Sequence, residues 1–177
     1  MKILDAGSAA MSNMEVLLWI EEKRAQHSAE DAEARAAKAK PRPRPKNFMD
    51  ALKKHQRVLK SKQYPYDQNP DAYSNKTDKY ASMRQLDEKI CEEIIYPLEE
   101  GYKGNGMKSD ELEASLGKEQ EAKELTETEH LMIHNLAPKC LEQFQPIIEN
   151  LDERYTAEEQ EKIVEAINSV YRCNEAA

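Results

Sequence analysis

Two histidines stand four residues apart, the spacing at which two imidazoles on one helix face can bind the same metal ion. They are His130 and His134, in a segment with helical periodicity. A hydrolytic zinc helix also needs a glutamate directly after the first histidine as its base, but Leu131 occupies that position and Glu129 is used by a helix cap. The motif is incomplete, so we interpret both histidines as half-buried helix residues. A metalloenzyme stays an alternative that metal analysis would test.

No other group of residues predicts an active site or a cofactor. Cys91, Cys140 and Cys173 lie far apart and form no CxxC pair, which favours a reducing compartment. The glycines from Gly101 to Gly106 are spaced as in a phosphate-binding loop, but no strand precedes them and no Gly-Lys-Ser/Thr follows, so we interpret them as a connection. We therefore predict that the protein is not an enzyme and has no catalytic residue, cofactor or metal.

A basic stretch is interpreted as a spacer or a nuclear-import signal, with binding of nucleic-acid phosphates as the alternative. Between Lys38 and Lys62 there are ten Lys or Arg and one acid, whereas residues 110–165 contain sixteen acids and five bases. The candidate patch consists of Lys40, Arg42, Arg44, Lys46, Lys53, Lys54 and Arg57. A nuclear-import signal or a disordered spacer would have the same composition. The basic and acidic parts are expected to meet different partners.

Helix caps and apolar periodicity predict an all-α protein. Three capping boxes, in which a hydroxyl and a glutamate three residues later each bond the other's amide, predict helix starts: Ser12 with Glu15, Thr126 with Glu129, and Thr156 with Glu159. Apolar residues at helical spacing predict a helix from Lys79 that ends near Pro97, and Pro146 must bend or restart the helix that it interrupts. Period-two alternation is missing, so a strand is expected only at Lys2–Asp5.

The 177 residues divide into three predicted parts. Residues 1–36 are predicted to hold a strand and a helix. Residues 37–78 are predicted to be a basic, proline-rich linker or insertion that is partly disordered, with a short basic helix as an option from Asn47 to Lys62. Residues 79–177 are predicted to form a helical domain. No apolar run approaches the roughly 20 residues that span a bilayer, so we expect a nuclear or cytosolic protein without membrane contact.

The first helix is predicted to bind a partner subunit. Five consecutive apolar residues, Val16–Ile20, cover more than half of a helix circumference, so this turn is either partly open to solvent or buried on two sides, which requires a second surface. The strand at Lys2–Asp5 would add to another protein's sheet. The candidate partner-binding residues are Ile3, Leu4, Met11, Asn13, Val16, Leu17, Trp19 and Ile20, with Trp19 as the expected hot spot.

Two segments carry a resemblance to a known family. The first is Lys2-Ile3-Leu4 followed by Met11-Ser12-Asn13-Met14-Glu15-Val16, similar to a Leu-Ser-Asn-Tyr-Glu-Val motif with Met at positions 11 and 14. The second runs from Leu125-Thr126-Glu127-Thr128-Glu129 through Ile133, Asn135-Leu136, Pro138 and Ile147-Ile148-Glu149 to Asp152-Glu153-Arg154-Tyr155-Thr156 and Glu159. The middle, residues 32–79, does not match. In order and spacing these segments resemble the smaller stalk subunit of eukaryotic RNA polymerase III, in the family of the archaeal F subunit and the CGRP-receptor component protein.

The resemblance implies a non-catalytic subunit whose N-terminal segment associates with the tip of a larger OB-fold stalk subunit. A helical domain similar to the helicase-and-RNase-D C-terminal (HRDC) fold would follow. The heterodimer would stand on the polymerase III core in the nucleus and support promoter opening and initiation-factor docking for transcription of tRNA and 5S rRNA genes. Nucleic acid would be contacted indirectly, through the partner. The alternative is a free nucleic-acid-binding module of the HRDC type.

Overall fold

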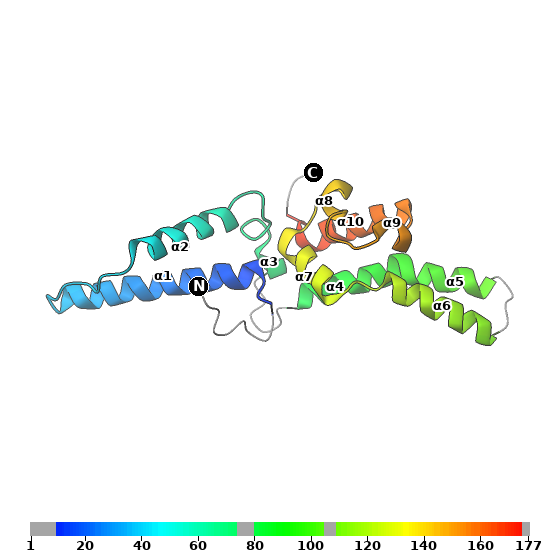
Figure 1. Ribbon diagram of the computed structural model, residues 1–177, viewed down its shortest axis with the longest axis horizontal. Coiled ribbons are helices and arrows are strands. Elements are labelled where there is room, and N and C mark those ends of the chain that lie inside the picture. Colours follow the sequence, from blue (N-terminus) through cyan, green and yellow to red (C-terminus); the bar gives the residue numbers. More distant parts are fainter. Residues whose placement is uncertain (1–9, 74–79, 105–108, 175–177) are drawn as a thin grey trace. The chain divides into compact units, whose positions relative to one another are not determined.

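The computed structural model describes residues 10–73, 80–104 and 109–174, and within these residues every regular element is a helix (Figure 1). The all-α prediction is therefore confirmed. The strand expected at Lys2–Asp5, with the partner contacts of Ile3 and Leu4, lies outside the described residues. The chain forms two compact units, Met1–Tyr66 and Asp67–Ala177. Among the described helices, none combines the length and hydropathy that crossing a membrane requires.

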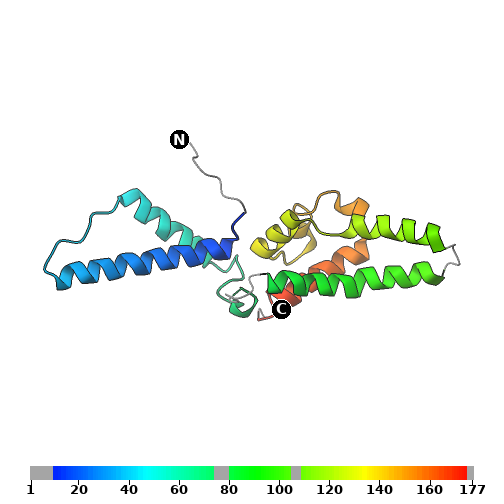
Figure 2. The same cartoon turned by 90° about the horizontal axis from the view of Figure 1, so that it is seen from below.

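The first unit is a pair of antiparallel helices, α1 (Asn13–Ala36) and α2 (Lys46–Leu59), which lie side by side in both views (Figures 1 and 2). The capping box predicted for α1 is present, because Ser12 Oγ accepts from the amide of Glu15 at 3.2 Å and Glu15 Oε2 accepts from the amide of Ser12 at 2.8 Å. The short basic helix predicted within the proline-rich region is also confirmed, as α2.

Apolar and polar contacts join α1 and α2. Leu17 and Ile20 of α1 are buried, as are Leu52 and Leu59 of α2. On the same side of α1, Glu21 pairs with Lys60 at 2.6 Å, directly after the end of α2, and Arg24 donates a hydrogen bond to Gln56. The part of the chain predicted to be a linker thus contributes an ordered helix to this unit.

The second unit is a helical bundle whose core lies between α4, α7, α8 and α10. Its elements are α3 (Pro70–Tyr73), α4 (Ala81–Ile90), the π-helical turn η1 (Cys91–Ile95), α5 (Tyr96–Gly104), α6 (Ser109–Lys123), α7 (Glu127–Leu136), α8 (Leu141–Phe144), α9 (Leu151–Arg154) and α10 (Ala157–Tyr171). The side chains of Leu86, Ile133, Phe144, Ile163 and Ile167 are fully buried in it. The capping boxes predicted at Thr126 and Thr156 begin α7 and α10.

The helix predicted to end near Pro97 continues instead, which corrects the sequence interpretation. Proline removes an amide donor and its ring clashes with the carbonyl four residues earlier, here that of Glu93. Glu93 lies in η1, where the turn widens and the amide of Tyr96 bonds to the carbonyl of Cys91, five residues back. The wider turn accommodates Pro97 in the first turn of α5, so α4, η1 and α5 form one long helical segment (Figure 2).

Pro146 has the opposite effect and divides its helix. α8 ends at Phe144, the amide of Ile147 bonds to the carbonyl of Phe144 at 2.9 Å, and α9 begins only at Leu151. The sequence left open whether Pro146 bends the helix or makes it end and start again. In the structure the helix ends and a new one starts. The apolar spacing of this segment is that of one helix, but the segment therefore forms two short helices, α8 and α9.

Candidate interaction surfaces

The predicted partner-binding residues of α1 lie in different environments. Among those within the described residues, Leu17 and Ile20 are buried, Asn13 and Val16 are half-buried, and Met11 and Trp19 are exposed. Leu17 and Ile20 are 3% and 2% exposed within the chain alone, so α1 uses them internally. Leu18, absent from the predicted set, is 39% exposed beside Trp19 at 42% and Met11 at 57%. We refer to these three exposed residues, Met11, Leu18 and Trp19, as the N-terminal apolar patch.

Most of the predicted basic patch is exposed, but Arg44 is not. Lys40, Arg42, Lys46, Lys53, Lys54 and Arg57 are exposed to solvent. The Arg44 side chain is only 14% exposed and donates to Asp31 Oδ1 at 2.6 Å, Glu30 Oε2 at 2.9 Å and the carbonyl of His27 at 3.1 Å. These bonds raise the pKa of Arg44. The hydrogen bond that Arg44 donates to Glu30 lowers the pKa of Glu30. Arg44 therefore fixes the loop against α1, and its charge is already neutralised.

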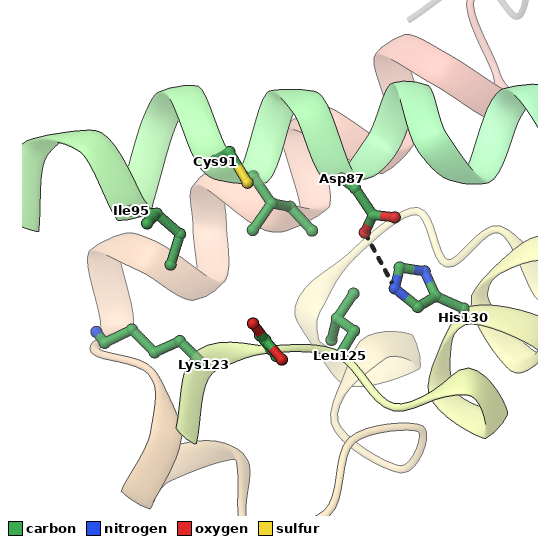
Figure 3. Close-up of a pocket in the computed structure, with 8 residues that line it drawn as sticks. Asp87, Cys91, Ile95, Lys123, Leu125 and His130 are labelled. Atoms are coloured by element: carbon green, nitrogen blue, oxygen red, sulfur yellow. Dashed lines mark ion pairs between the residues drawn. The ribbon is translucent and has the colours of Figure 1, made fainter. Parts of the chain in front are cut away.

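A pocket of about 310 Å³ lies beside α4 and η1, where the chain passes from α6 to α7 (Figure 3). It is lined by Asp87, Ile90, Cys91, Ile95, Lys123, Glu124, Leu125 and His130. Across it, His130 Nε2 lies 3.0 Å from Asp87 Oδ1. Burial raises the pKa of the Cys91 thiol, and the carboxylates of Asp87, Glu124 and Glu99 raise it further. The thiol is thus kept protonated, which opposes a role as a nucleophile.

The two histidines weighed as metal ligands have separate neighbours. His130 contacts Asp87, whereas the buried His134 packs between Tyr73 and Tyr171, with ring centroids 5.0 and 5.6 Å away. Within the three described ranges of the chain, no group of three or more His, Cys, Asp or Glu side chains is placed to hold a metal ion. The geometry of His134 is that of a packed core residue.

Arg154 joins the two ends of the C-terminal segment on which the sequence resemblance rests. Its guanidinium donates to Glu129 Oε1 at 2.5 Å and to the carbonyls of Ala122, Glu124 and Glu149 at 2.9, 2.7 and 3.2 Å. One side chain therefore connects α9 with the end of α6, the start of α7 and the turn before α9. The sequence interpretation missed this role, because it treated Glu129 as a cap alone.

Two glutamates of capping boxes also form ion pairs with side chains from other helices. Burial opposes ionisation of Glu129, but hydrogen bonds from Arg154 and from the amides of Thr126 and Glu149 outweigh it and lower its pKa. Glu159 is similarly desolvated, and its pKa is lowered by Lys123 at 2.6 Å and by the cap.

Tyr155 adds a further bond between these helices. Its hydroxyl donates to the carbonyl of Lys123, and burial raises its pKa to about 12, so the phenol stays protonated. Arg154, Tyr155 and the ion pair of Lys123 with Glu159 together fix α6, α7, α9 and α10 against one another.

Comparison with known protein families finds one whose model matches most of the chain. The family model described as RNA polymerase Rpb4 matches residues 10–171. That range includes Met11–Val16 and Leu125–Glu159, the segments that carry the sequence resemblance within the described residues. No curated protein matches the chain.

Proposed function

Because this chain belongs to the RNA polymerase Rpb4 family, we propose that it is the smaller stalk subunit of RNA polymerase III. In this role it forms a heterodimer with the larger OB-fold stalk subunit on the polymerase core, in the nucleus. The family match over residues 10–171 carries the proposal, since it supports an accessory subunit of a polymerase stalk. The choice of polymerase III is supported by the Met11–Val16 motif and by the spacing of the C-terminal segment.

The partner contact is assigned to the N-terminal apolar patch. Met11, Leu18 and Trp19 are large apolar residues that the chain leaves exposed at the start of α1. An aromatic residue with apolar neighbours is typical of the residues that dominate binding energy in protein interfaces. Leu17 and Ile20 take part indirectly, because their burial holds α1 against α2. Asn13 and Val16 complete the contact at its edge, and Ile3 and Leu4 stay part of the proposed partner site.

The mechanism is presentation of surfaces and involves no bond chemistry. Residues 110–165 carry sixteen acids and five bases, and this acidic part would attract basic initiation factors by charge complementarity. The OB-fold partner would supply the single-strand contact that supports promoter opening. The contacts of Arg154 with Glu129 and with three backbone carbonyls give the helical domain the rigidity that docking requires.

Affinity purification of the tagged protein from its own nuclei at moderate salt tests the proposal. Mass spectrometry should identify, in stoichiometric amount, an OB-fold stalk partner together with polymerase III subunits. Subunits of a different polymerase would contradict the assignment to polymerase III but keep the stalk role. Nucleic acid or unrelated factors without any polymerase would contradict the stalk role and favour a free HRDC-type module.

A further inference from the structure

The cations around α2 divide into two groups according to what they contact. Lys60 pairs with Glu21 of α1 at 2.6 Å, and Arg44 pairs with two acids of α1. In the part of the chain that the structure describes, the side chains of Lys46, Lys53, Lys54 and Arg57 make no hydrogen bond or ion pair, although all four residues are exposed. The first group holds the two helices together, and the second has no structural partner.

The unpaired cations share one face of α2. Lys46, Lys53 and Arg57 are separated by seven and four residues, which places them in one row along the helix, with Lys54 beside it. At 1.5 Å per residue the row is about 16 Å long. The other face carries the buried Leu52 and Leu59 and is covered within the unit. We call the four exposed cations the α2 basic face.

Nearby acids neutralise this face only in part. Glu30 and Asp31 are occupied by Arg44, and Glu21 is occupied by Lys60. Asp50, the one acid between Lys38 and Lys62, lies on the same face, four residues after Lys46 and three before Lys53, and leaves the four cations with a net charge of +3. The exposed Lys40 and Arg42 extend the positive charge into the loop before α2. A disordered spacer would have no fixed row of charges, whereas here a helix packed on α1 holds them in register.

We propose that the α2 basic face, with Lys40 and Arg42, binds the phosphodiester backbone of nucleic acid without reading its sequence. Along a duplex strand one phosphate occurs per about 3.4 Å of axis, so a 16 Å row spans about five phosphates. Lysine ammonium groups are compact charges that position a backbone, and base edges are read by other side chains. The contact is direct, and it goes beyond the stalk role, in which the OB-fold partner supplies the nucleic-acid contact.

The test measures binding of the full-length chain to a fluorescent single-stranded oligouridylate and to duplex DNA with the same number of phosphates, between about 50 and 200 mM salt. The variant is Lys53→Gln with Arg57→Gln. The matched control is Lys118→Gln with Lys162→Gln, which removes the same charge from exposed positions of α6 and α10. Circular dichroism confirms that both variants stay folded.

Loss of two phosphate contacts should lower the steepness of log K against log salt by about 1.4 for the single strand and about 1.8 for the duplex. For the single strand this corresponds to a loss of about 25-fold in affinity near 0.1 M salt. The control pair should keep the steepness of the unaltered chain. The tighter of the two probes then identifies the source of the phosphates, single-stranded or duplex, and either result supports the site.

Three results would overturn the proposal. The first is no binding of either probe by the unaltered chain at the lowest salt. The second is an equal loss in the test and control variants, which would mean a general charge effect. The third is competition by polyglutamate as strong as that by oligouridylate at equal charge, which would assign the face to an acidic protein segment such as that of an import receptor.

Discussion

Leu17, Leu18 and Trp19 are consecutive on α1, yet their environments differ. Successive helical residues are turned by about 100°, so neighbours in sequence face different sides. Leu17 is 3% exposed and packs within the unit, whereas Leu18 and Trp19 are 39% and 42% exposed. One apolar run thus has one residue buried within the chain and two exposed residues, which form part of the proposed contact with a partner. Substitutions at these positions should separate the two.

Trp19→Ala should weaken the heterodimer without unfolding the chain. Truncating a central aromatic residue of an interface costs about 2–4 kcal/mol, which raises the dissociation constant by about 30- to 1000-fold. Isothermal titration calorimetry with the purified stalk partner measures the dissociation constant. Tyr96→Ala, which removes another exposed aromatic side chain, is the control and should leave binding unchanged. Leu17→Ala should instead lower the melting temperature. Unaltered affinity in Trp19→Ala would remove this residue from the interface.

Arg154→Ala should destabilise the second unit by about 3 kcal/mol, because the buried carboxylate of Glu129 loses its partner and three carbonyls nearer the surface lose a donor. Arg154→Lys should restore only part of the loss, since an ammonium group cannot reproduce the planar set of donors. Urea unfolding followed by circular dichroism measures both variants. Lys162→Ala, at an exposed position, serves as a control and should change the free energy of unfolding by no more than about 0.5 kcal/mol. A loss below about 1 kcal/mol for Arg154→Ala would contradict a central role.

At the scale of elements, the helix starts were predictable because their signals are local. Ser12 and Glu15, like Thr126 and Glu129, lie within four residues of each other, so the caps follow from the sequence alone. Pro97 was misinterpreted because the π turn that accommodates it depends on packing of the continued helix. The burial of Leu17 was unpredictable for a related reason, since α2 begins about 30 residues later in the sequence.

Part of the candidate sites could likewise be predicted from composition, and part could not. The basic residues between Lys38 and Lys62 were evident, but nothing local distinguishes Arg44, which is paired, from the exposed Arg42. That distinction depends on acids of α1 more than ten residues away. The link between Arg154 and Glu129 spans 25 residues and has no sequence signal of its own. Charge identifies candidates, and tertiary contacts decide which charges are available.

The ion-paired caps of α7 and α10 should make stability fall in acid. Glu129 and Glu159 have pKa values below the ordinary glutamate value, so the native state binds fewer protons than the unfolded state. Their contribution is complete above pH 4.5 and is lost as pH falls through the lowered values. Urea unfolding between pH 7 and pH 3 should show a decline beginning near the ordinary glutamate range of about pH 4.3.

Glu129→Gln provides the control for this acid dependence. The variant should be less stable at neutral pH and should lose less on acidification, because one of the two ion-paired carboxylates no longer titrates. Glu161→Gln, at an exposed position of α10, should keep the full decline. If Glu129→Gln and the unaltered chain lose stability equally between pH 5 and 3, the cap of α7 is not a source of the acid sensitivity.

Over the whole molecule, charge is divided unevenly between the two units. Met1–Tyr66 has fourteen bases and eight acids, whereas Asp67–Ala177 has twelve bases and 26 acids. The net charge of −8 therefore combines a basic and an acidic part. The first unit also carries the N-terminal apolar patch. Its proposed contact with the stalk partner is apolar, whereas the proposed contact of the second unit with basic factors is electrostatic.

These two contacts should respond differently to salt. Raising salt from about 0.1 to 1 M shortens the screening length from about 10 to 3 Å, which weakens exposed charge pairs, while burial of apolar surface persists. In affinity-purified complexes washed at increasing salt, quantitative mass spectrometry should show basic initiation factors lost first and the OB-fold partner retained. Trp19→Ala should lose the partner at every salt concentration. Release of partner and factors at the same salt would mean that the stalk contact is itself electrostatic, and the basic α2 face would then become the better candidate for it.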